Sequence, residues 1–301
     1  MRDDIVLTTD SGMCPNKEYN PIIVPDQITC SDGRCFIDDG IDITTDDIFN
    51  DQKNSYKTAA PLLPDYEDTF VKLLQDKKNI IHLSLGGGIS SSSVNNANLI
   101  ANKLNDEYEN KVYVIDSCTG SVGGTCYYEA AYQMLRDSDL PVDLLKAELE
   151  RLKYYIKTSF YVPDATGFIR SGRDKSKKYS FSQSVLTLSS SLLRKTSFKF
   201  RVDFHENGDL YLKSIFRSNR RNGMLTMTRN IVNENNIQDY KSDFCVIGDL
   251  HQKDVDMDEL ERYLLSFDYF KKVVISDVGN VVAPYGCDDL CGIALVKKKE
   301  K

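Results

Sequence analysis

The sequence has no apolar run that approaches the roughly 20 residues that a membrane-spanning helix needs. Its first ten residues, MRDDIVLTTD, are too acidic and too poor in apolar residues for a secretory signal peptide. We therefore expect a cytoplasmic protein without integral membrane association. In that reducing compartment its eight cysteines are expected to be free thiols.

Histidine is scarce, because His82, His205 and His251 are the only three in 301 residues. No sequence pattern joins any of them to a serine and an acid, as a catalytic triad requires. The chain also lacks a Gly-x-Ser-x-Gly elbow, a P-loop and a Gly-x-Gly-x-x-Gly dinucleotide fingerprint. Hydroxyl donors are abundant while an obvious base is missing, which favours the binding of an anion over catalysis.

Patterns for metal binding are missing as well. Only Cys287 and Cys291 have a spacing that suggests a metal site, and no second pair or nearby histidine completes a zinc set. The acidic stretch from Asp38 to Asp47 lacks the regular ligand spacing of a calcium loop. We therefore expect neither a metal nor a cofactor. The formal net charge of −7 argues against broad binding to nucleic acid or to anionic membranes.

What the chain does contain is a glycine- and serine-rich turn, within residues 80–104, IIHLSLGGGISSSSVNNANLIANKL. The apolar run before the turn predicts a strand buried on both faces. Gly86, Gly87 and Gly88 would let the backbone turn sharply and approach a ligand. Ser90, Ser91 and Ser93 fall where a helix begins, and the unpaired N–H groups there attract an anion. An ordinary capped helix after a flexible turn explains the same residues.

Strands and helices alternate in the first half of the chain, which predicts βαβ units and a parallel sheet. Asp10 and Ser11 follow the strand at residues 5–9, at the carboxyl end where parallel sheets bind ligands. Turn chemistry is the alternative role for this pair. Residues 57–61, Lys-Thr-Ala-Ala-Pro, are expected to form a polar loop ahead of a helix.

The pattern changes near Lys157. The second half contains a β-rich stretch from residue 158, a predicted hairpin at residues 198–216, and further strands with a helix. This mixture predicts a separate α+β domain. We therefore divide the chain into an N-terminal α/β domain, residues 1–157, and a C-terminal α+β domain, residues 158–301.

Short motifs in a fixed order along nearly the whole chain resemble those of the DegV family. They are Thr9-Asp10-Ser11, Lys57-Thr58 with Pro61, the serine turn followed by Asn95-Asn96-Ala97, Ile115-Asp116-Ser117 with Gly123, Arg170-Ser171-Gly172-Arg173, Gly208, His251, Gly286 and Gly292. No one of these motifs is specific. Their order and spacing carry the resemblance.

The resemblance implies two α/β domains, an N-terminal three-layer α/β/α domain with a parallel sheet and a mixed C-terminal domain, with a long-chain fatty acid in a tunnel between them. It implies that Thr58 and the serine turn hold the carboxylate, with Asp10 and Ser11 nearby. It further implies a non-catalytic carrier that presents the carboxyl group to a fatty acid kinase. Arg173 and His251 are then expected at the docking surface for that kinase.

The sequence also departs from the family pattern. The usual Thr-Ser-Gln-Pro is Thr58-Ala59-Ala60-Pro61 here, and the serine turn lacks its usual glycine and is one residue longer. Tyr285 lies where a histidine usually precedes Gly-Pro-Gly. Two alternatives therefore stay open: a serine-dependent acyl hydrolase or transferase, and a binding protein for another small carboxylate or phosphate.

Overall fold

The structure is a computed structural model. It describes residues 2–51, 53–165, 167–168, 171, 198–217, 220–234, 242–249, 257–266, 270–286 and 290–297.

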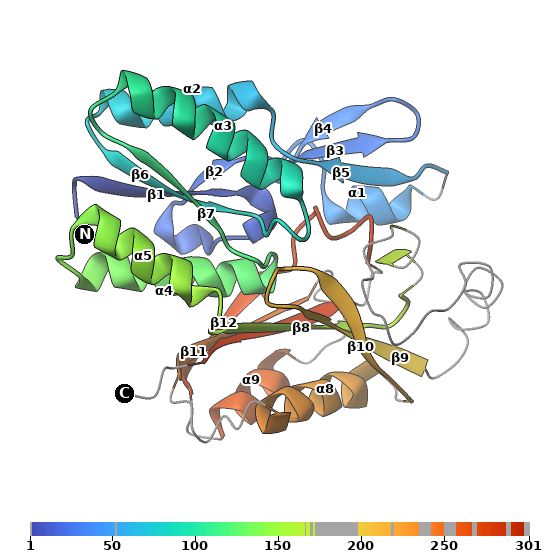
Figure 1. The fold of residues 1–301 in the computed structure, drawn as a ribbon. Coiled ribbons are helices and arrows are strands. Elements are labelled where there is room, and N and C mark those ends of the chain that lie inside the picture. Colours follow the sequence, from blue (N-terminus) through green and yellow to red (C-terminus); the bar gives the residue numbers. More distant parts are fainter. Residues whose placement is uncertain are drawn as a thin grey trace.

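The first half of the chain is built on a parallel four-stranded sheet in the order β2-β1-β6-β7. Its strands are β1 (Ile5–Asp10), β2 (Ile22–Val24), β6 (Asn79–Ser84) and β7 (Val112–Asp116). The helices α2 (Leu63–Gln75) and α3 (Ser91–Glu107) cover one face, and α4 (Val122–Asp137) and α5 (Val142–Leu152) cover the other (Figure 1). The predicted three-layer arrangement is confirmed.

A mixed six-stranded sheet in the order β10-β9-β8-β13-β11-β12 forms the second half. Its strands are β8 (Ile156–Val162), β9 (Phe198–Phe204), β10 (Leu210–Arg217), β11 (Ser242–Asp249), β12 (Phe270–Asp277) and β13 (Cys291–Val296). Only the β11–β12 pairing is parallel among those described. Helices α8 (Arg220–Glu234) and α9 (Met257–Leu265) cover its outer face, and α4 packs on its inner face (Figure 1).

Helix α4 therefore lies between the two sheets, and the largest core surrounds it. That core joins apolar residues of the first sheet, such as Leu83, to residues of the second, such as Val246, through Val122 and Tyr127 of α4. A second core lies beneath α2 and α3, and a third beneath α8 and α9. The division after residue 157 stays a prediction; strand β8, which contains this point, belongs wholly to the second sheet.

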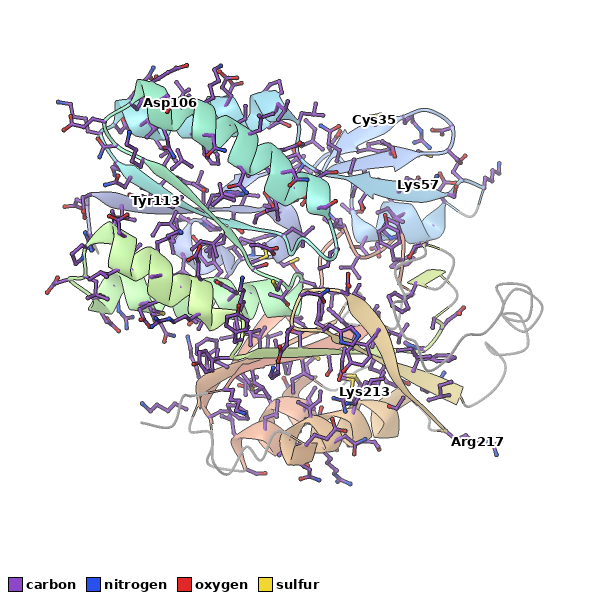
Figure 2. All side chains as sticks on the ribbon, in the orientation of Figure 1. Cys35, Lys57, Asp106, Tyr113, Lys213 and Arg217 are labelled. Atoms are coloured by element: carbon purple, nitrogen blue, oxygen red, sulfur yellow. The ribbon has the colours of Figure 1, made fainter. Side chains whose placement is uncertain are left out.

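A small antiparallel sheet in the order β4-β3-β5 projects from the N-terminal half. It consists of β3 (Gln27–Cys30), β4 (Cys35–Ile37) and β5 (Tyr56–Ala59), with the short helices η1 (Ser11–Met13), η2 (Lys17–Tyr19) and α1 (Thr45–Asn50) in the same half. Cys35 of β4 and Lys57 of β5 both pair with Thr29, so they flank the middle strand (Figure 2). The predicted polar loop at residues 57–61 is thus wrong for residues 57–59, because pairing with β3 supplies the hydrogen bonds of a strand.

The carboxylate of Asp10 is fully buried at the carboxyl end of β1. Its Oδ1 accepts hydrogen bonds from Tyr66 Oη at 2.7 Å and lies 3.1 Å from His82 Nε2. Its Oδ2 accepts from Ser84 Oγ at 2.9 Å and from the backbone N–H of Leu85 at 2.7 Å. Burial by itself would raise the pKa of Asp10, but His82 and the other donors outweigh it, and the pKa is lowered. The ring of His82 is itself fully buried here.

We expect Asp10→Ala to lower the free energy of unfolding by about 3–5 kcal/mol, because it leaves buried donors without their acceptor. Urea unfolding followed by circular dichroism measures this change. The control is Asp137→Ala, which removes an exposed ion pair with Arg136 and should leave the urea midpoint nearly unchanged. An unchanged midpoint for Asp10→Ala, together with lost ligand binding, would instead assign Asp10 a direct ligand role.

Candidate functional site

A cavity lies between the two halves of the chain, with a volume of about 850 Å³ when its open mouth is included. One wall is apolar and comes from the second sheet. It includes Phe160 and Val162 of β8, Val202 and Phe204 of β9, and Leu210 of β10. Inward-facing apolar side chains on adjacent strands make a continuous surface that suits a hydrocarbon chain.

The lining also carries polar groups, beside apolar residues such as Leu85 and Ile89 of the N-terminal half. The polar residues are Asp26, Thr58, Ser90, Ser121 and Tyr285. Four of these residues belong to the N-terminal half, so the two halves contribute different chemistry. The described residues of the lining include no lysine, arginine or histidine. Among the described lining residues, the groups that could hold an anion are hydrogen-bond donors.

Thr58 is joined to Tyr285 across 227 residues of sequence. The backbone N–H of Thr58 donates to Tyr285 Oη at 3.1 Å, and the two hydroxyl oxygens lie 2.9 Å apart. Thr58 lies on β5 opposite Ile28, which is buried in the core, and this pairing fixes its position. The residue that departs from the family pattern, Tyr285, thus completes a hydroxyl pair in the cavity wall. The substitution is visible in the sequence, but no local pattern there indicates this contact.

Of the serine turn, Ser90 lines the cavity. It is the N-cap of α3, yet its hydroxyl makes no capping bond and instead accepts a hydrogen bond from Ser93 Oγ at 2.8 Å. Ser93 is buried behind it, whereas Ser91 is exposed and does not line the cavity. Farther along the same helix, the amide of Asn96 donates to the Pro61 carbonyl at 3.1 Å, which ties α3 to the segment after β5.

The three glycines before this turn approach protein backbone and side chains closely. A Cβ on Gly86 would lie 2.5 Å from the Thr119 nitrogen, and one on Gly88 would lie 2.3 Å from the Gly208 carbonyl carbon. Gly208 has a φ of +82° in the β9–β10 turn, so both sides of that contact need glycine. None of the three glycines lines the cavity. We expected their backbone to approach a ligand closely, but it approaches other parts of the fold instead.

Asp10 and Ser11 lie behind the cavity wall rather than in its lining. Both carboxylate oxygens of Asp10 are engaged by the hydrogen bonds described above. Ser11 Oγ donates to Asp26 Oδ2 at 3.0 Å and accepts from the Asp26 backbone N–H at 2.9 Å. Asp26, which sequence analysis missed, is therefore the residue of this cluster that reaches the cavity. An aspartate directly after Pro25 is typical of a turn, so its sequence context gave no signal.

The two residues expected at a docking surface, Arg173 and His251, lie outside the described residues. Of the other histidines, His205 is exposed and stacks on Tyr211, with ring centroids 4.0 Å apart. In the described part of the chain no group of three or more histidine, cysteine, aspartate or glutamate side chains could hold a metal ion. None of the described helices is long and apolar enough to cross a membrane.

Comparison with known proteins identifies the family. Residues 4–298 match the family model described as "Uncharacterised protein, DegV family". A curated relative, the DegV domain-containing protein UU535 of Ureaplasma parvum serovar 3, is 26% identical over 180 residues. The matched segment is 58% of this chain and 58% of that relative, so it spans well under two thirds of either.

Solved structures have the same fold at low sequence identity. A DegV family protein from Thermus thermophilus, described under "Fatty Acid Binding", has a TM-score of 0.79 and 20% identity over 98% of this chain and 100% of its own. A protein from Eubacterium eligens, loaded with heptadecanoic acid, has a TM-score of 0.79 and 17% identity, with the same coverage.

The Fatty Acid Kinase (Fak) B3 protein of Streptococcus pneumoniae, loaded with linoleic acid, has a TM-score of 0.78 and 18% identity. That match covers 98% of this chain and 99% of the Streptococcus protein. Because the family model spans nearly the whole sequence and these folds agree with the two-sheet architecture, the chain belongs to the DegV family.

Proposed function

We propose that this protein binds a long-chain fatty acid, with its carboxylate at Thr58, Ser90 and Tyr285 and its acyl chain along the apolar wall. The observation that carries the proposal is one cavity whose lining combines hydroxyl groups with the apolar residues of adjacent strands. Such a cavity matches a ligand with a polar head and a long apolar tail. The fatty acids described in the Thermus, Eubacterium and Streptococcus proteins, which share this fold, support the same ligand class.

The energetics of this ligand fit the residues available. Each buried methylene contributes about 0.8 kcal/mol, so an acyl chain supplies most of the affinity. Hydrogen bonds from hydroxyl groups to a charged carboxylate contribute about 1.5–3 kcal/mol each and fix its orientation. Both contributions come from residues that line the cavity, and neither needs a metal or a cofactor.

We further propose that the protein is a cytoplasmic, non-catalytic carrier that presents the carboxyl group to a fatty acid kinase. The name of the Streptococcus protein supports such a partner. A carrier role also agrees with the state of Ser90, whose hydroxyl is bonded to Ser93 and not to a base among the described residues. The alternative of a serine-dependent acyl hydrolase lacks a described histidine at this serine, because His82 contacts Asp10 and Thr8.

Protein purified from a lipid-replete host should release a long-chain fatty acid when it is denatured, because the apolar wall retains the acyl chain. Mass spectrometry of the organic extract identifies the ligand. Protein without an acyl chain, which also fails to take up added oleate or palmitate, would contradict the proposal. Release of a non-lipid anion, or turnover of a chromogenic ester, would favour one of the two alternatives.

Thr58→Ala and Ser90→Ala should each weaken oleate binding by about ten-fold or more, since each removes a hydroxyl donor to the carboxylate. Fluorescence competition with a labelled fatty acid gives the dissociation constants. Ser91→Ala is the matched control in the same turn, because Ser91 is exposed and should bind oleate like the wild type. Equal losses for Ser90→Ala and Ser91→Ala would mean that the helix start, not Ser90, holds the ligand.

Arg173→Ala should lower acyl-phosphate formation when the cognate kinase and ATP are added, because a guanidinium can bind carboxylate or phosphate with two parallel hydrogen bonds. Fatty acid binding and the melting temperature of this variant should stay close to those of the wild type. A variant that supports full kinase turnover would contradict a docking role for Arg173. A variant that no longer binds fatty acid would show that Arg173 has a structural role instead.

A further inference from the structure

Asp26 is an unusual lining residue because it is only 1% exposed and carries a carboxyl group into a largely apolar cavity. Its Oδ2 accepts two hydrogen bonds, from the backbone N–H of Gly12 at 2.8 Å and from Ser11 Oγ at 3.0 Å. Its Oδ1 has no hydrogen-bond partner within the described part of the chain. Asp26 lines the cavity, and Oδ1 is the oxygen of its carboxyl group that Ser11 and Gly12 do not engage.

No lysine, arginine or histidine among the described residues pairs with Asp26, and its charged neighbours have its own sign. Burial, followed by the charge of Asp10 and that of Asp38, raises the pKa of Asp26 well above its usual value. In the neutral acid the proton lies on Oδ1, because Oδ2 already accepts two hydrogen bonds.

The geometry of the small sheet places Asp26 near Thr58. Ile28 of β3 pairs directly with Thr58 of β5, and Asp26 comes two residues before Ile28. The backbone bond from Asp38 N–H to the Asp26 carbonyl, 2.9 Å long, continues the β3–β4 ladder, so Asp26 keeps the strand register. Residues two apart on a strand face the same side, and diagonal neighbours across a pair lie within reach of one bound group.

A carboxylate bound at Thr58 needs more donors than the hydroxyl groups supply. Thr58 and Tyr285 bond to each other, so one of their two hydroxyl protons is already used. Ser90 accepts from Ser93 and has its own proton to give. These hydroxyl groups cannot supply the roughly four hydrogen bonds that a carboxylate can accept. The proton on Asp26 Oδ1 is a further donor at the same wall.

We propose that Asp26 is a ligand-binding residue that shares one proton with the carboxyl group of the bound fatty acid, as an acid–carboxylate pair. This inference rests on the proposed function and adds to it a specificity for ligands that can accept that hydrogen bond. It also makes binding depend on pH. Affinity is high while the pair holds its proton and falls as pH rises and two negative charges face each other.

Other titratable groups around Asp26 must be separated from it in any pH experiment. They are Asp10 of β1, Asp38 after β4, Cys14 after η1, Tyr66 of α2 and Tyr285 of the cavity wall. Asp38 is the best matched control. It is largely buried and bonded to Asn280, and it lies outside the cavity lining.

The experiment measures oleate affinity between about pH 6 and about pH 9, where a free carboxylic acid is ionised. The variants are Asp26→Asn, which keeps a donor but cannot titrate, Asp26→Leu, which has no donor, and the control Asp38→Asn. NMR of bound oleate labelled with ¹³C at its carboxyl carbon reports directly on the protonation of that group. Thermal melting of each variant checks that it is folded.

The affinity of the wild type and of Asp38→Asn should fall by about ten-fold or more across this range, with a matching ¹³C shift. Asp26→Asn should show neither change. At the low end of the range Asp26→Leu should bind about ten-fold more weakly than the wild type. Equal pH profiles for wild type and Asp26→Asn, or full affinity of a folded Asp26→Leu, would overturn the inference. A wild type that takes up no oleate would overturn the proposed function itself.

Discussion

A buried carboxylate at the end of β1 determines where the surrounding elements lie. Asp10 loses its hydration in the core, and that loss must be balanced by donors held at fixed positions. The donors come from α2, from β6 and from the backbone of Leu85, directly after β6. The chain therefore leaves the sheet at a fixed point before Gly86. From there the glycines pass close to Thr119 and Gly208, and Ser90 reaches the cavity.

The part of the cavity wall that contains Thr58, Tyr285 and Asp26 depends on contacts between residues far apart in sequence. Thr58 is held by the small sheet, and it bonds to Tyr285 from the segment between β12 and β13. Asp26 directly precedes β3 of the same sheet and is bonded to Ser11 and Gly12 after β1. Since Asp10 fixes the end of β1, the buried network and the cavity wall share a common support. A change in the network should therefore affect the ligand site without direct contact.

Sequence periodicity predicted most of the fold but only part of the site. Strands such as β1, β6 and β7 are apolar and bounded by turn residues, so their pattern is distinct. Helix α8 was not predicted, because its buried residues Met224, Met227 and Ile231 are set among polar ones. Ser90 was found from the serine turn and Thr58 through the family resemblance, and both line the cavity. Tyr285, which bonds to Thr58, and Asp26, which also lines the cavity, could not be found as site residues, because no local pattern reports a contact formed only by tertiary folding.

The absence of a cation from the described lining has a consequence for how a carboxylate is held. An arginine would bind it with two charge-assisted bonds and oppose its release. In the proposed complex, hydroxyl groups and the proton of Asp26 orient the same group without a fixed opposite charge. The acyl chain then supplies the affinity and the polar wall supplies the orientation. This division suits the proposed carrier, since the head group can leave its donors for a partner while the apolar wall still retains the chain.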